Sequence, residues 1–120
     1  MKTMVFGASP RPQRFSHIAT LRLIEAGVEV IPVGIHSGLI GSQPIVDLNE
    51  KPTYPDIHTI TMYLNRINQR MWYSYILKLS PERMIFNPGS ENPELYQILL
   101  ENEIPYQESC TLVMLASGSY

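Results

Sequence analysis

Residues 6–14, FGASPRPQR, contain the side chains best suited to binding an anion. Gly7 permits a tight turn after an apolar run, and the Ser9 hydroxyl and nearby backbone N–H groups can donate to a phosphate. The following segment is typical of a helix, whose N-terminus adds a positive dipole. Arg11 and Arg14 can add forked, charge-assisted contacts. The segment therefore predicts a phosphate site, and the alternative is a loop that only caps the helix, with its arginines in solvent.

The same residues argue against two common nucleotide motifs. The dinucleotide fingerprint G-x-G-x-x-G would need glycines where this chain has Ser9 and Pro12. It also needs an acid after the second strand, and this chain has Gly34-Ile35-His36 there. No G-x-x-x-x-G-K-[ST] motif occurs anywhere in the chain. A nicotinamide cofactor and a P-loop nucleotide are therefore not expected. The donors and arginines of the opening loop suit an anion larger and more charged than a bare pyrophosphate.

The elements that would position these residues alternate along the chain. Strands are predicted at 2–8, 29–34, 56–64, 82–88 and 104–109, and helices at 16–26, 68–80, 93–103 and 110–117. Residues 36–52, which glycine and proline punctuate, are predicted as loop with room for one short strand. This alternation predicts an α/β fold of three layers, with a mainly parallel sheet of about five strands and helices on both faces.

Ligands of such sheets bind beyond the carboxyl ends of the strands, where the strand order switches. Loops 7–16, 34–38 and 64–68 are predicted to meet at that edge, and 87–92 is a candidate fourth loop. Pro32 indicates a sheet edge or an interruption in the second strand. Ser16 is predicted to cap the first helix. The predicted buried faces are Ile18, Leu21 and Ile24 on helix 16–26, and Met71, Tyr75 and Leu79 on helix 68–80.

Composition limits the classes of protein that fit. The 120 residues suggest one domain, 1–120, with a hydrophobic share of 44% and a net charge of −2 that makes no case for nucleic acid. No apolar run approaches the ~20 residues of a membrane helix, so we expect no membrane span. The one cysteine, Cys110, excludes an internal disulfide framework and favours a reducing cytoplasm.

Four motifs follow one another in the order and at the spacing of a known family. They are GASPRPQRFSHIATLRLIEAGVEVIPVG, TITMYLN, IFNPGSENPEL and CTLVML. Together they resemble the small stand-alone CoA-binding proteins of bacteria and archaea, which are similar to the N-terminal CoA-binding domain of the succinyl-CoA synthetase alpha subunit. The resemblance covers essentially the whole chain. It implies a Rossmann-like fold that binds coenzyme A.

The resemblance also implies a set of binding residues. Its phosphate-binding loop corresponds to Gly7, Ala8, Ser9, Arg14 and Ser16, the loop after the second strand to Gly34, Ile35, His36 and Ser37, and the loop after the third to Leu64 and Asn65. The chain departs from the family at Val33-Gly34-Ile35, where many relatives have Val-Asn-Pro. It also has Arg66 where relatives commonly have proline, and Arg66 either reaches the ligand or points into water. His36 is the nearest basic residue to the position of a lysine in the synthetase.

Other polar residues have two interpretations each. Cys110 is either a nucleophile at a helix start or a packed structural thiol, and Glu91 is either a general base or an anchor for backbone N–H groups. The aromatic side chains of helix 68–80 either pack in the core or form a subunit contact. The three histidines and one cysteine have no recognisable metal-binding spacing.

Three functions are consistent with these residues. The first is a cytoplasmic module that binds coenzyme A or acyl-CoA without catalysis of its own. The second is an enzyme that acts on a CoA-bound acyl group through Glu91 or Cys110. The third is a regulatory or assembly subunit that senses CoA and meets a partner through helix 68–80. The predicted ligand is thus a small molecule, with no nucleic acid or membrane partner, and a homo-oligomer is left open.

Overall fold

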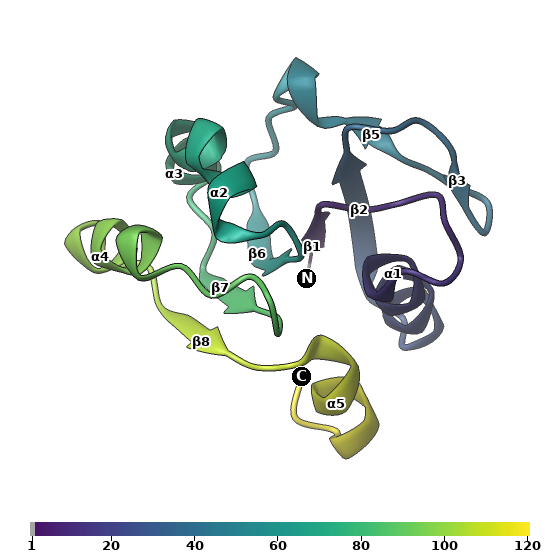
Figure 1. Ribbon diagram of the computed structural model, residues 1–120. Helices are drawn as coiled ribbons and strands as arrows, with labels where there is room; N and C mark the ends of the chain where they lie inside the picture. Colours follow the sequence, from purple (N-terminus) through teal and green to yellow (C-terminus); the bar gives the residue numbers. More distant parts are fainter. Residues whose placement is uncertain (1) are drawn as a thin grey trace.

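The computed structural model describes residues 2–120, and a six-stranded sheet forms its centre (Figure 1). The strand order is β5-β2-β1-β6-β7-β8, and every neighbouring pair is parallel. The strands are β1 (Lys2–Phe6), β2 (Glu29–Gly34), β5 (Val46–Asp47), β6 (Ile57–Met62), β7 (Arg83–Phe86) and β8 (Tyr106–Glu108). The two-residue β5 falls in the segment where one short strand was left open. A separate antiparallel pair, β3 (Leu39–Ile40) and β4 (Gln43–Pro44), precedes it.

Helices cover both faces of the sheet, which confirms the predicted α/β, Rossmann-like fold (Figure 1). The helices are α1 (Phe15–Glu25), α2 (Arg66–Gln69), α3 (Tyr73–Leu79), α4 (Pro93–Glu101) and α5 (Thr111–Ser117). Helices α1 and α5 lie together on one face, and α2, α3 and α4 lie on the other. No helix in residues 2–120 is long and apolar enough to cross a membrane.

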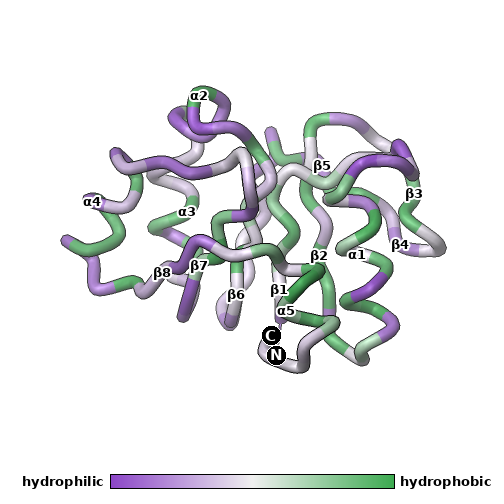
Figure 2. The backbone as a smooth tube through the Cα atoms, turned by 60° about the horizontal axis from the view of Figure 1, so that its bottom comes forward, coloured by the Kyte–Doolittle hydropathy of each residue, from purple (hydrophilic) through white to green (hydrophobic). Residues whose placement is uncertain are grey.

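The central strands are buried on both sides, so their apolar residues divide between two cores. On β1, Met4 and Phe6 belong to the larger core beneath α3 and α4, whereas Val5 belongs to the smaller core beneath α1. Phe6 meets Trp72 edge to face, with ring centroids 6.5 Å apart. In Figure 2 the tube through the central strands is largely white to green, whereas the segment around α2 is mostly purple.

Polar side chains connect the sheet to α5 through hydrogen bonds. Asn87 is buried just beyond β7, and its amide donates to the Thr61 hydroxyl (2.7 Å) and the Met62 carbonyl (3.0 Å). Its amide oxygen accepts from the Thr111 N–H at 2.8 Å, one of the free donors at the start of α5. One side chain thereby joins the ends of β6 and β7 to the helix that covers them.

The first helix differs from its predicted face and cap. It begins at Phe15 after Arg14, without a side-chain cap, so Ser16 is not the capping residue. Ile24 is exposed, which makes the predicted face wrong. The buried residues are Ser16, His17, Ala19, Thr20 and Leu23. The buried face of α1 therefore carries polar residues that are paired: His17 Nδ1 contacts the Ser9 carbonyl of the preceding loop, and the Thr20 hydroxyl donates to the Ser16 carbonyl.

The predicted continuous helix 68–80 is also wrong. The side chain of Asn65 caps α2 by accepting from the Asn68 N–H, so the helix starts earlier. A 3₁₀ turn, Arg70–Trp72, then separates α2 from α3. Because this turn changes the helical phase, Met71 is exposed and Trp72 is buried. Tyr75 and Leu79 remain buried, as predicted.

Pro32 lies where β2 lacks a second neighbour. Its register partner on β1 is Val5, whereas β5 pairs only with Val33 and Gly34. The Val33 carbonyl faces the β1 side, so the nitrogen of Pro32, one residue earlier, faces the other side ahead of β5. The missing N–H therefore removes no ladder hydrogen bond, in agreement with the predicted local edge.

We predict that Asn87→Ala lowers the free energy of unfolding by about 1–3 kcal/mol, because it leaves the Thr111 N–H and the Met62 carbonyl without this partner. Urea denaturation measures the change. Asn49→Ala is the control, since Asn49 is exposed, and it should change stability by less than about 0.5 kcal/mol. Equal effects of the two substitutions would show that the Asn87 network does not stabilise the fold.

Candidate binding site

A hollow of about 410 Å³ lies at the carboxyl ends of β1, β2 and β6. The chain runs from β1 to β2 on one side and later reaches β6 on the other, so this is the point where strand order switches. Residues from all four predicted loops line it: Gly7, Ala8, Ser9, Arg11, Arg14, Phe15, Ser16, Gly34, Ile35, His36, Leu48, Tyr63, Leu64, Asn65, Asn68 and Pro88. The four loops therefore meet at this edge of the sheet, as predicted.

The loop after β1 is held tightly against the end of β2. The N–H groups of Gly7 and Ala8 both donate to the Val33 carbonyl, at 2.9 and 2.8 Å. Gly7 has a φ of +100°, which favours glycine. A Cβ on Gly34 would lie 2.3 Å from the Ala8 carbonyl oxygen, which is much closer than a Cβ packs against a neighbouring heavy atom. The loop can thus pass over β2 only because residue 34 has no side chain.

His17 fixes the far end of the same loop. It lies in the first turn of α1, is 6% exposed, and its Nδ1 is 2.8 Å from the Ser9 carbonyl oxygen. Because a carbonyl can only accept, Nδ1 carries the proton and donates it. The Arg11 N–H donates to the Ser9 hydroxyl oxygen at 3.2 Å. Sequence reasoning did not assign His17 a role, and its only signal was its place one turn into the helix.

Free donors and free cations gather on this side of the hollow. Within residues 2–120, the backbone N–H groups of Ser9, Gln13, Phe15 and Ser16 have no acceptor. In the same part of the chain, Arg11 and Arg14 have no carboxylate within 4 Å. The lining contains neither Asp nor Glu. Together with the N-terminus of the 11-residue α1, these groups form a site of positive potential that suits phosphate.

The opposite wall comes from the turn after β6. Tyr63 follows β6 directly, and its N–H donates to the Phe6 carbonyl at 2.9 Å. Burial raises the pKa of Tyr63 to about 12, so its phenol is neutral at physiological pH. Leu64 lies against Gly7, where an added Cβ would be 3.0 Å from its side chain. This wall is therefore uncharged and partly apolar, in contrast to the arginine side.

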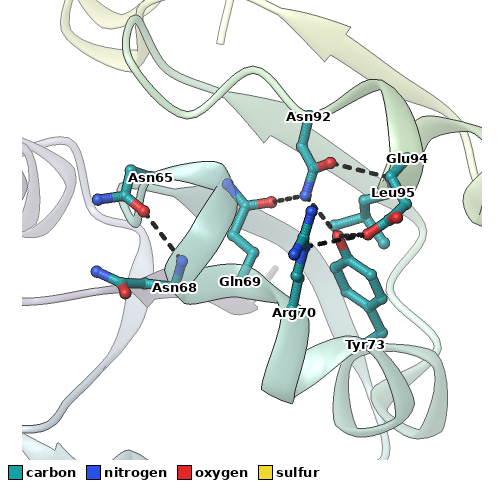
Figure 3. Close-up of polar contacts among 8 residues, drawn as sticks. All are labelled: Asn65, Asn68, Gln69, Arg70, Tyr73, Asn92, Glu94 and Leu95. Atoms are coloured by element: carbon teal, nitrogen blue, oxygen red, sulfur yellow. Dashed lines mark hydrogen bonds and ion pairs between the residues drawn. The ribbon is translucent and has the colours of Figure 1, made fainter.

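A buried amide network fixes the turn after β6 to the loop after β7 (Figure 3). The Gln69 side chain, fully buried, donates through Nε2 to the carbonyls of Leu64 and Ser90, both at 2.8 Å. Its Oε1 accepts from Asn92 Nδ2 at 2.8 Å. Asn92 also caps α4 by accepting from the Leu95 N–H. Two rim loops and two helices are thus held in one arrangement. Sequence reasoning gave no role to Gln69.

The two candidate reactive residues lie outside the hollow. The Glu91 carboxylate accepts from the Gly89 N–H at 2.9 Å, which is the anchoring geometry. Cys110 is half-buried and precedes α5. Neither side chain belongs to the lining of the hollow.

Most of the predicted binding residues come together. The lining includes Gly7, Ala8, Ser9, Arg14, Ser16, Gly34, His36, Leu64 and Asn65. Ser37 is exposed and outside the lining, and Arg66 lies in a second hollow on another side of α2. Their contacts with a ligand remain predictions. The sequence did not single out Phe15, Leu48, Tyr63, Asn68 and Pro88 as lining residues. The predicted helices and strands do not say which loop residues turn toward the hollow.

The fold and the hollow define a Rossmann-like α/β protein with a hollow rich in free hydrogen-bond donors at its switch point. Residues 1–116 match the family model of the CoA binding domain, and the chain belongs to this family. The family predicted from the four motifs is thus confirmed. A comparison with proteins of curated function gave no match.

Solved structures share the fold over nearly the whole chain. The crystal structure of an uncharacterized protein has 45% identity and a TM-score of 0.94, covering 99% of this chain and 97% of that one. A Thermus thermophilus protein has 21% identity and a TM-score of 0.85, covering 99% and 90%. A conserved hypothetical protein from Pyrococcus furiosus has 21% identity and a TM-score of 0.82, covering 93% and 97%. At the low identity of the last two, the likeness shows the fold alone.

We predict that Gly34→Ala weakens binding of CoA, the ligand named in the family's description, by at least about tenfold. The new methyl group must displace the Ala8 carbonyl and with it the loop after β1. Calorimetry measures the affinity, and urea denaturation shows how much protein is folded. Gly118→Ala is the control: its φ of +74° makes the substitution strained, but the space around it is open. It should lose stability and keep the affinity. Wild-type affinity in Gly34→Ala would contradict this account of the loop.

Proposed function

We propose that this protein binds coenzyme A or an acyl-CoA in the hollow at the switch point and catalyses no reaction of its own. Membership of the CoA binding domain family supports the ligand class. The observation that carries the proposal is the concentration of unpaired donors at one end of the hollow. Three backbone N–H groups, those of Ser9, Phe15 and Ser16, and two arginines lie there without acceptors or carboxylates among residues 2–120.

The residues present fit the parts of CoA. Its diphosphate would bind the N–H groups at the start of α1, with Arg11 and Arg14 supplying charge. The absence of a side chain at Gly34 lets the Ala8 carbonyl pack against the end of β2, which holds the loop after β1 at the edge of the hollow. Phe15 and Ile35 line the same hollow although they are 71% and 60% exposed, and they would cover apolar parts of the ligand. His36 is the basic residue of the loop after β2 and would face a further phosphate.

The surroundings of the two reactive candidates favour binding without catalysis. Glu91 already holds the loop through the Gly89 N–H, and Cys110 lies outside the lining of the hollow. A group that acts on a CoA-bound acyl chain must lie within hydrogen-bonding reach of the reacting atoms. The single cysteine also supports a reducing, cytoplasmic location.

We predict that CoA, acetyl-CoA and dephospho-CoA bind more tightly than NAD, which lacks the pantetheine arm. Arg14→Ala should weaken CoA binding by about 1–3 kcal/mol, or roughly 5- to 150-fold, because it removes a charge-assisted contact to phosphate. Isothermal titration calorimetry measures both effects.

The matched control is Arg22→Ala, which removes the same charge from the far end of the same helix. It should leave CoA affinity within about twofold of the wild type, since exposed charges at a distance are largely screened. Tighter binding of NAD than of CoA would contradict the proposed function. An equal loss in the two arginine variants would show that Arg14 acts only through overall charge.

A further inference from the structure

A second hollow, of about 440 Å³, adjoins the first across α2. Asn65 and Asn68 line the first hollow, whereas Arg66, Ile67 and Arg70 line the second. Figure 3 shows Asn65 and Asn68 on one side of Gln69, with Arg70 and Glu94 on the other. The two hollows therefore share one short helix as their common wall.

This wall is fixed in place. Gln69 holds α2 through the carbonyls of Leu64 and Ser90, and Asn92 Nδ2 holds Gln69 in turn. The Asn92 amide also donates to the Tyr73 hydroxyl at 2.9 Å, so both of its N–H groups are in use. The polar groups of Gln69 and Asn92 are thus committed to structure. The side chains left to meet a ligand are the arginines and the apolar residues.

The second hollow has an excess of positive charge. Arg70 Nε lies 3.6 Å from Glu94 Oε1, and this oxygen also accepts from the Tyr73 hydroxyl at 2.9 Å. Among residues 2–120, Arg66 has no carboxylate within 4 Å. The second hollow thus contains two guanidinium groups, of Arg66 and Arg70, and one carboxylate, of Glu94. The net positive charge can attract one further anion. Planar guanidinium groups match carboxylates in two-pronged hydrogen bonds.

Apolar surface accompanies this charge. Ile67 is 68% exposed although it is an isoleucine, and Pro93 lies in the same lining. A ligand with a short methylene chain and an anionic end would cover Ile67 and Pro93 and reach Arg66. A free inorganic anion would leave the apolar part uncovered.

We propose that the second hollow receives the acyl group of an acyl-CoA, and that it selects acyl groups that end in a carboxylate. This inference rests on the proposed function, which puts the phosphates at the start of α1. The lining of the first hollow includes Leu64, Asn65 and Asn68, which reach α2. The pantetheine arm would run along these residues and pass over the outer side of α2, which would place the thioester end in the second hollow. The acyl methylenes then cover Ile67 and Pro93, and Arg66 pairs with the terminal carboxylate.

The test compares acyl groups of equal length by calorimetry at low ionic strength. Glutaryl-CoA and pentanoyl-CoA each have five acyl carbons and differ in a terminal carboxylate against a methyl group, and succinyl-CoA and butyryl-CoA form the four-carbon pair. We expect the carboxylate member of at least one pair to bind about 5- to 20-fold more tightly. The preference should shrink as salt is added, because the pair is partly exposed.

Two substitutions assign the effect to this hollow. Arg66→Gln should reduce the preference to within about twofold, and Glu94→Gln, which removes the opposing charge and keeps an acceptor for Tyr73, should increase it. Arg22→Gln, on the other face of the molecule, is the matched control and should retain the wild-type preference.

Each result decides the inference. Equal affinities within both pairs, with CoA still bound, would overturn the inference and leave the proposed function standing. A preference that persists in Arg66→Gln would also overturn it, because the carboxylate would then bind elsewhere. Failure of CoA and all four thioesters to bind would overturn the proposed function and the inference with it.

Discussion

The rest of the site depends on one close approach, that of the Ala8 carbonyl to Gly34. The carbonyl oxygen occupies the place that a Cβ at residue 34 would take, and the Val33 carbonyl accepts from both Gly7 and Ala8. This contact sets the direction in which the chain leaves β1. His17 then holds the Ser9 carbonyl, so the loop is fixed at both of its ends. Phe15 and Ser16, which carry free N–H groups at the start of α1, line the hollow beside this loop.

The two sides of the hollow are built by different physical means. The loop after β1 supplies positive charge through backbone dipoles and arginines, and it is held by backbone contacts. The rim after β6 and β7 supplies shape, and buried amides hold it through Gln69 and Asn92. A ligand with charged and apolar portions suits such a division. The amides of Gln69 and Asn92 are already paired, so recognition of a ligand falls to the arginine side, to the apolar walls and to the other polar lining residues, such as His36 and Asn68.

The fold was predictable because its strands are buried on both faces and its loops are punctuated by glycine and proline. The meeting of the site loops followed from parallel topology, since the carboxyl ends of parallel strands share one edge. The face of α1 was not predictable from apolar spacing, because its first turn buries Ser16 and His17, and the spacing gives no sign of the Ser9 carbonyl that pairs with His17. Gln69 was missed for a related reason: a glutamine reads as a surface residue until its carbonyl partners, from two separate loops, are known.

The central claim is that the start of α1 binds the phosphates of CoA. Titration of ¹⁵N-labelled protein with CoA, followed by amide chemical shifts, tests it most directly because it reports on each N–H group separately. We expect the largest changes at Ser9, Gln13, Phe15 and Ser16, which lack acceptors within residues 2–120, and none of comparable size along β8. Large shifts confined to residues outside the hollow, with these four amides unchanged, would contradict the account.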